Sequence, residues 1–188
     1  PKFLPPEIAE QLDWRAGEDR GRIYRLRPTG VPLDEFEKAT SPVDVLKLLA
    51  SPHGWRRTLG QRRLVERGQT VARQDLQALT GHSQPTTRLH ALWTLHGLQQ
   101  LTSQDVLRAL QDSHPQIREA ALQLATPWIT DDDVRTAAVA LRDDVDAGVR
   151  FRLAVLMSHV DDDSVAVPEL VQLAASARTA PLLIEGLL

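Results

Sequence analysis

Apolar residues recur at helical spacing along most of this chain. The spacing i, i+3, i+4, i+7 occurs at Val134, Ala137, Ala138 and Leu141, and it occurs again within residues 167–174. Such spacing gathers apolar side chains on one face of a helix. Turn-forming residues interrupt the pattern at short intervals, which predicts pairs of helices. We expect first helices at 43–50, 75–80, 105–111, 132–142 and 165–177, and second helices at 55–67, 87–98, 117–125 and 149–160, with a last one opening near Pro181.

Two series of charged residues repeat in phase with these helices. Each second helix opens near an arginine, and the spacings are 31, 30 and 32 residues between Arg57, Arg88, Arg118 and Arg150. Each first helix opens near an aspartate, with spacings of 30, 28 and 30 residues between Asp75, Asp105, Asp133 and Asp163. A single helical pair cannot bury its apolar face, so repeated pairs must stack. We therefore predict an all-α fold, an α-α superhelix in which four pairs and part of a fifth occupy residues 43–188.

The residues between the helices fit this division. Within the first three pairs the expected turns contain Pro52, Pro85 and Pro115, and 146–148 serves as the turn of the fourth. The acidic runs 131–133 and 161–163 stand where first helices begin, as helix caps do. Those runs could also bind Ca²⁺, but they lack the loop spacing of a calcium site. Caps are the favoured interpretation.

Composition narrows the chemistry that these residues can perform. The 188 residues contain no cysteine, which excludes disulfides, cysteine-ligated metals and haem attachment within them. Apolar residues make up 42% and aromatic residues only 4%, so the core must consist of Leu, Val and Ala. No apolar run reaches the length of a membrane span, and direct membrane insertion is not expected. No nucleophile, base and orienting group can be combined into a catalytic site, so we expect no catalytic, cofactor-binding or metal-binding residue.

Charge is unevenly distributed along the chain. The net charge of −3 is the sum of +4 over residues 1–73 and −7 over residues 74–188. A group of basic residues lies in and after the second helix of the first pair: Arg56, Arg57, Arg62, Arg63, Arg67 and Arg73. They are the only group that resembles a nucleic-acid footprint, but helical spacing scatters them and few aromatic residues accompany them. We expect a protein partner and no nucleic acid.

The second helices resemble a known repeat. The sequences at 88–92 (RLHAL) and 117–122 (IREAAL) look like the second helix of short bacterial HEAT repeats, although the period of about 30 is shorter than a full-length HEAT unit. The resemblance implies a HEAT-repeat solenoid that binds other proteins.

Residues 1–30 do not follow the repeat. The run 21–30 predicts one strand, and one strand requires a sheet that other residues supply. The segments 3–8, 13–17 and 19–25 resemble the end of the β-propeller in planctomycete-type membrane-bound dehydrogenases, and 54–57, 61–68 and 88–95 fit the continuation. In that family a propeller similar to quinoprotein sugar dehydrogenases precedes HEAT repeats, often with a cytochrome c domain. The resemblance divides the chain into the propeller end (1–30), a linker (31–42) and the solenoid (43–188).

This resemblance implies a setting for the chain. The parent protein would be a dehydrogenase with a quinone cofactor and haem, working in the periplasm or at the outer face of a membrane, and neither group would contact a residue present here. The repeats would be a non-catalytic interaction or spacer module that contacts its own propeller, a cytochrome c domain or another protein. Two alternatives stay open. The repeats could take part directly, by docking cytochrome c or closing the propeller's active site, or they could form a free-standing scaffold or a nucleic-acid-binding solenoid.

A few residues stand out as candidates for specific roles. We expect Arg57, Arg88, Arg118 and Arg150 to form a structural ladder by bonding carbonyls or acidic residues of a neighbouring turn, such as Asp112 with Arg118 and Asp146 with Arg150; a binding row is the alternative. Trp14 and Trp55 are candidates for packing at a domain junction or against a partner. Trp93 is expected in the core. His53, His82 and His114 occur in corresponding turns, where we expect turn residues and not metal ligands.

Overall fold

The computed structural model describes residues 41–66 and 71–176, all within the second of two units of the chain, Lys38–Leu188. These residues form helices and connecting turns, with no strand among them, so the all-α prediction is confirmed for this part of the chain. The strand expected at 21–30, residues 31–40 of the expected linker, Trp14 and the helix expected near Pro181 lie outside the described residues. The end of the expected linker is wrong by one residue, because Pro42 already begins a helix that Ser41 caps.

Shorter first helices alternate with longer second helices from α2 to α9, and α10 is a longer first helix. The first helices are α2 (Pro42–Leu48), α4 (Arg73–Leu79), α6 (Ser103–Leu110), α8 (Asp132–Val139) and α10 (Asp163–Ser176). The second helices are α3 (Gly54–Glu66), α5 (Pro85–Gly97), α7 (Pro115–Leu124) and α9 (Ala147–Met157). The helix expected at 132–142 is divided, because α8 passes into the 3-10 turn η3 (Ala140–Asp143).

Helix beginnings depend on local caps. Ser41 precedes α2 and its Oγ accepts the backbone N–H of Asp44 at 3.2 Å. Pro85 and Pro115 are the first residues of α5 and α7, so the prediction that they lie between the helices is wrong. Proline is favoured at this position because the first N–H of a helix has no acceptor within the helix.

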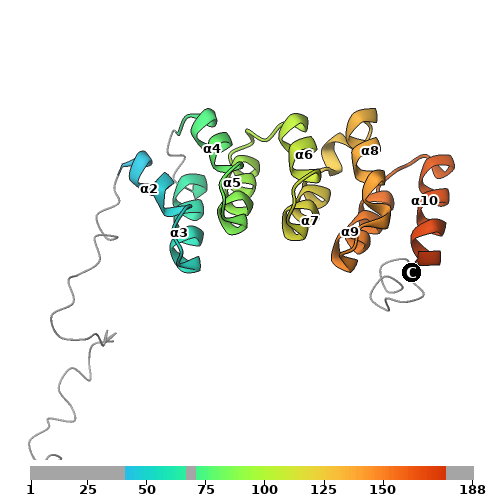
Figure 1. Ribbon diagram of the computed structural model, residues 1–188. Helices are drawn as coiled ribbons and strands as arrows, with labels where there is room; N and C mark the ends of the chain where they lie inside the picture. The colour runs from blue at the N-terminus through green and yellow to red at the C-terminus, as the bar shows by residue number, and fades with distance from the viewer. Residues whose placement is uncertain (1–40, 67–70, 177–188) are drawn as a thin grey trace, which may run out of the picture. The chain divides into compact units, whose positions relative to one another are not determined.

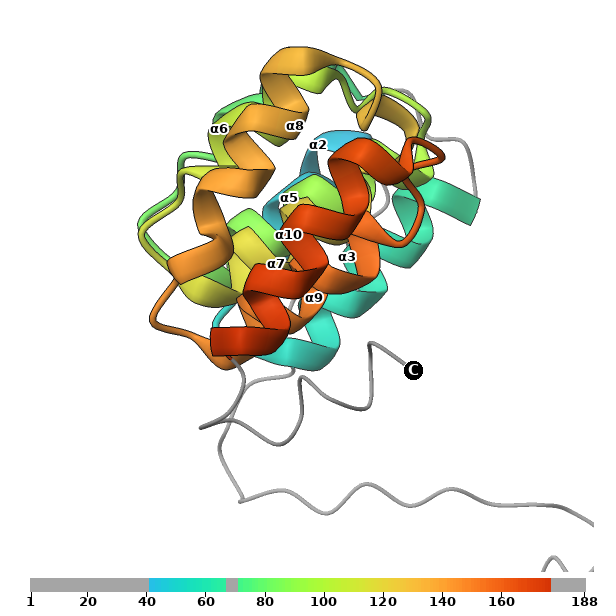
Figure 2. The same cartoon turned by 90° about the vertical axis from the view of Figure 1, so that its right-hand side faces the viewer.

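The helices pack in two layers. Each of α2, α4 and α6 packs against the second helix that follows it, and the second helices contact one another in the order α3, α5, α7, α9. Figure 1 shows the pairs following one another in a row, and Figure 2 shows the first helices α6 and α8 on one side and the second helices α7 and α9 on the other. After the fourth pair, the first helix α10 packs against α9 and η3. Neighbouring pairs in sequence are therefore neighbours in space.

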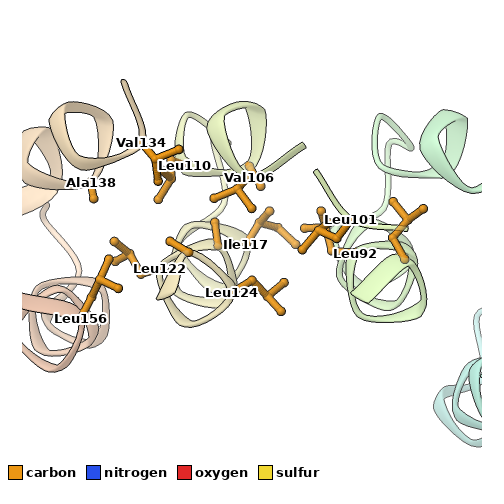
Figure 3. Packing of buried hydrophobic residues seen from close by; sticks show 14 of the residues in the cluster. Leu92, Leu101, Val106, Leu110, Ile117, Leu122, Leu124, Val134, Ala138 and Leu156 are labelled. Atoms are coloured by element: carbon orange, nitrogen blue, oxygen red, sulfur yellow. The ribbon is translucent and has the colours of Figure 1, made fainter. Parts of the chain in front are cut away.

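A continuous apolar core runs between the layers. Figure 3 shows Leu92, Leu101 and Ile117 joining one pair to the next, and Leu122, Val134 and Leu156 extending the same cluster. Each fully buried leucine contributes about 2 kcal/mol through loss of apolar surface from water. In the first three pairs the residue three places after the repeated arginine is small and buried, as Gly60, Ala91 and Ala121. At Gly60 the neighbouring helix is close, because an added Cβ would lie 2.9 Å from Cβ of Leu48.

Candidate functional site

The turns between first and second helices share one local structure. We call their leading residues, Ser51, His82, Asp112 and Asp144, the turn positions. Each side chain accepts the backbone N–H two residues later, at 3.3 Å for Ser51, 3.1 Å for His82, 2.8 Å for Asp112 and 2.9 Å for Asp144. Such side-chain turns fix the direction in which the chain enters the second helix.

The arginine ladder, Arg57, Arg88, Arg118 and Arg150, is anchored on these turns. Every member donates from Nη1 to the carbonyl oxygen of its own turn position, at 2.7, 2.8, 2.8 and 2.5 Å in chain order. This bond satisfies a carbonyl in the turn after each first helix, where the backbone offers no helical N–H partner. The same arginine therefore closes the same turn in four successive pairs.

Two members of the ladder also reach the following pair. Arg88 donates from Nε and Nη2 to the carboxylate of Asp112 at 2.8 and 2.7 Å. Arg118 does the same to Asp144 at 2.7 and 2.8 Å. The Arg118 and Asp144 side chains are only 12% and 6% exposed, so this two-bond pair is largely screened from water. Hydrogen bonding with Asp144 raises the pKa of Arg118 above its ordinary value, against the opposing effect of burial.

The pairs expected from the sequence differ from these. Arg118 reaches Asp112 only through the backbone carbonyl, because the Asp112 carboxylate is bound by Arg88. Arg150 bonds the carbonyl of Asp144, whereas the Asp146 carboxylate caps α9 by accepting the N–H of Val149 at 3.2 Å. The reason is the shape of the guanidinium group. One edge faces its own turn, and the Nε–Nη2 edge faces the turn of the next pair.

The ends of the ladder lack an acidic partner among the described residues. Arg57 and Arg150 each have a buried Nε with no hydrogen-bond partner there. The acid that would complete the Arg57 rung belongs at position 82, where histidine stands. His82 keeps the bond to the N–H of Gln84 but supplies no carboxylate.

Replacing His82 with aspartate should therefore add a rung. We expect His82→Asp to raise the free energy of unfolding by about 1 kcal/mol, because a carboxylate there can retain the turn bond and pair with Arg57. Urea denaturation measures the change. Ser83→Asp, which adds an acidic residue at the exposed neighbouring position, is the control and should have little effect. An equal effect of both substitutions would contradict the added rung.

A second polar contact joins neighbouring first helices. Arg73 at the start of α4 donates to the Asp105 carboxylate at 2.5 Å and to the carbonyl of Gln100 at 3.0 Å. Asp105 also accepts the N–H of Thr102 at 3.1 Å, which caps α6, and its side chain is 2% exposed. Sequence reasoning identified Asp105 only as a helix opener and missed this pair. The separation of 32 residues, about one period, was the available signal.

The other sequence candidates are placed as follows. Arg57 and Arg73, members of the basic group, are engaged with the protein's own turns and acids. The acidic runs cap helices: Asp131 accepts the N–H of Asp133, and Asp162 accepts that of Ser164. Hydrogen bonds from Ser164 lower the pKa of Asp162. Among residues 41–66 and 71–176, no three His, Cys, Asp or Glu side chains are grouped as metal ligands.

The histidines do not occupy equivalent places. His53 and His114 stand two residues after a turn position, whereas His82 is itself a turn position. The three therefore lie in corresponding turns, as predicted, but at two different positions within them. Trp55, the junction candidate, is 53% exposed, and the guanidinium carbon of Arg56 lies 5.4 Å from its ring centroid. Its role at a junction stays a prediction.

A groove opens between the second helices α3 and α5. Its volume is about 410 Å³. Its lining consists of Thr58, Gln61, Arg62, Val65 and Glu66 from α3, with Trp93, His96 and Gly97 from α5. Trp93 packs on the core yet stays partly exposed here, so the prediction of a core tryptophan holds only in part. Its ring meets that of His96 edge to face, with centroids 5.8 Å apart.

Close helix packing and one hydrogen bond shape this groove. A Cβ added to Gly97 would lie 2.8 Å from Cγ2 of Val65, so glycine allows the end of α5 to approach α3. His90 Nδ1 lies 2.7 Å from Gln61 Oε1. Burial, together with the charge of Arg57, lowers the pKa of His90, so its ring is neutral at pH 7. Since an amide oxygen only accepts, Nδ1 carries the hydrogen and fixes the Gln61 side chain.

The comparisons with known proteins add no assignment. The chain matches no family model, and no curated protein matches its sequence. Within the part of the chain that the structure describes, no helix has the length and apolar character required to cross a membrane.

Proposed function

We propose that this chain is a non-catalytic HEAT-type solenoid whose second-helix layer binds a partner protein. The observation that carries the proposal is the open groove of about 410 Å³ between α3 and α5, which combines an aromatic ring with polar side chains. Partly apolar grooves between helices with a few polar groups are common ligand sites. Repeat solenoids use the surface of stacked helices in this way.

The pattern of contacts supports the solenoid part of the proposal. Side chains tie each pair to the next: Arg88 to Asp112, Arg118 to Asp144, Arg73 to Asp105, and Arg142 to Glu169. These partners lie 24 to 32 residues apart, which is about one period. Contacts of this kind between successive units are typical of a quasi-one-dimensional repeat protein. Such a scaffold keeps a row of helices in fixed register without a catalytic centre.

The family resemblance supports a specific setting for the solenoid. In that setting the groove faces another domain of a larger propeller-containing oxidoreductase, or its cytochrome c domain, outside the cytoplasm. Direct participation in the dehydrogenase is the second version of the same setting. Both versions give the groove a protein partner, and they differ in which protein that is.

Position-specific crosslinking tests the proposal. A photoreactive phenylalanine analogue at Thr58 or His96, both exposed in the groove, should crosslink one discrete protein or domain in cells that make the parent protein. Matched exposed positions on first helices, Ala78 and Gln104, should not. Products containing propeller or cytochrome c peptides would support the dehydrogenase setting. Identical products from all four positions, or none from the groove, would contradict the proposed function.

A further inference from the structure

The groove between α3 and α5 has the size of a segment site. Binding pockets for small molecules have volumes of roughly 300–1,000 Å³, and this groove is near the lower limit at about 410 Å³. It therefore suits one or two side chains of an extended segment better than the flat face of a folded domain. Val65 and Trp93 supply apolar surface on opposite walls. An apolar side chain that enters between them is removed from contact with water on two sides at once.

One polar group of the groove is prepared for a peptide backbone. The Gln61 amide oxygen is occupied by His90, which orients the side chain. Within residues 41–66 and 71–176, the Gln61 amide nitrogen makes no hydrogen bond, so none of these residues occupies its two N–H groups. A peptide carbonyl oxygen is an acceptor that every segment carries, whatever its sequence. Donation from an already oriented amide loses little conformational entropy on binding.

Charge selects the kind of segment. Residues 41–66 hold five Lys and Arg against two Asp and Glu, whereas residues 111–176 hold five against twelve. An acidic segment is thus attracted to the end of the row that contains the groove and repelled from the other end. Arg62 lies on the groove wall with its side chain 66% exposed, and among the described residues its ion-pair partner is the similarly exposed Glu66 at 3.2 Å. An exposed pair of this kind exchanges readily for another carboxylate.

The groove between α8 and α10 makes a useful comparison. Its volume is about 380 Å³, and it is lined by Arg135, Arg142 and Glu169 among others. Arg135 is already bound to Asp132, and Arg142 to Glu169 and Gln172. It lies in the acidic part of the chain and has no aromatic side chain in its lining. The same acidic segment should not bind there.

From these observations we infer that the α3–α5 groove binds an extended acidic segment of a partner protein through one apolar anchor residue. The anchor lies between Val65 and Trp93, a backbone carbonyl accepts from Gln61, and an acidic residue beside the anchor pairs with Arg62. This inference rests on the proposed function, because it names the chemistry of the partner at the same surface.

Peptide binding to the 188-residue chain tests this inference. The probe is a short fluorescein-labelled peptide of Asp and Glu residues around a central Leu. Fluorescence anisotropy at low salt measures its binding. We expect binding that weakens with added salt. Replacing the central Leu with Asn, or the acidic residues with Lys, should each weaken binding by about tenfold or more. A lysine-rich peptide or a single-stranded oligonucleotide that binds as tightly as the probe would overturn the inference.

Two charge reversals locate the site. Arg62→Glu should weaken probe binding by about tenfold or more, whereas Lys47→Glu should change it by less than about twofold. Both residues are exposed cations in exposed ion pairs, and Lys47 lies on α2 outside the groove. Circular dichroism melting of both variants checks that the fold is kept. Equal effects of the two reversals, absence of probe binding, or binding that follows self-association in sedimentation would overturn the inference. If groove-specific crosslinks persist in any of those cases, the proposed function stands and only the partner chemistry fails.

Discussion

Asp144→Ala should lower the free energy of unfolding by about 3–5 kcal/mol, the range for breaking one side of a buried ion pair. The alanine would leave the Arg118 guanidinium, whose side chain is 12% exposed, without its carboxylate. It would also remove the acceptor for the N–H of Asp146, which lies 2.9 Å from Asp144 Oδ1. Urea denaturation followed by circular dichroism measures the loss.

Two further variants separate the causes of that loss. Asp143→Ala removes a neighbouring carboxylate whose side chain is 86% exposed, and it should change stability by less than about 0.5 kcal/mol. Asp144→Asn keeps an oxygen for the turn and removes the charge, so its effect should be intermediate. If Asp143→Ala and Asp144→Ala have the same effect, the buried pair does not stabilise the fold.

The contribution of Asp144 should also depend on pH. Burial raises the pKa of Asp144, but hydrogen bonds from Arg118 and from the N–H of Asp146 outweigh it and hold the pKa below its ordinary value of 3.8. A carboxyl group with a lower pKa in the folded state stabilises the protein above its unfolded pKa, and this stabilisation is lost as pH falls through the folded value. The difference between native protein and Asp144→Ala should therefore be constant near pH 7 and shrink below about pH 4.

The period of the arginines predicted where each member of the ladder stands, but not its carboxylate partner. Equal spacing identifies equivalent positions in successive pairs. It does not say whether a side chain turns toward its own pair or the next. Asp112 stands six residues before Arg118 and 24 after Arg88, and only the packing of neighbouring turns decides that Arg88 binds its carboxylate. Partner choice in a repeat is therefore a property of the stack.

The groove could not be predicted from the sequence for a related reason. Its walls are residues of two helices about one period apart, and its shape depends on the close approach of Gly97 to Val65. The apolar spacing of α5 predicted a buried Trp93, because spacing assigns a face and not the depth of a side chain on that face. The all-α pairs, in contrast, follow from local signals that act within a few residues: apolar spacing, the cap Ser41, and Pro85 at the first position of its helix.

Gly60→Leu is expected to destabilise the protein by about 1–3 kcal/mol through overpacking, or somewhat more. A Cβ at this position would lie 2.9 Å from Cβ of Leu48 and 3.2 Å from the carbonyl oxygen of Val45. Both atoms belong to α2, and neither is the flexible end of a side chain, so α2 would have to move away from α3. Thermal denaturation followed by circular dichroism measures the loss, and a fully tolerated leucine would contradict the close contact.

The fourth pair provides the physical contrast for this substitution. Leu153 stands at the position equivalent to Gly60 and is completely buried. There the first helix changes to the 3-10 turn η3, which packs against α9, so the geometry facing this position differs. Gly54→Leu is the control, because a Cβ at that exposed helix start meets only Arg57 Nη2 at 3.5 Å, and it should change stability by about 0.5 kcal/mol or less. The position three places after the arginine thus faces α2 in the first pair, and in the fourth pair it lies on a helix that packs against the η3 turn, so one pair requires glycine and the other accommodates leucine.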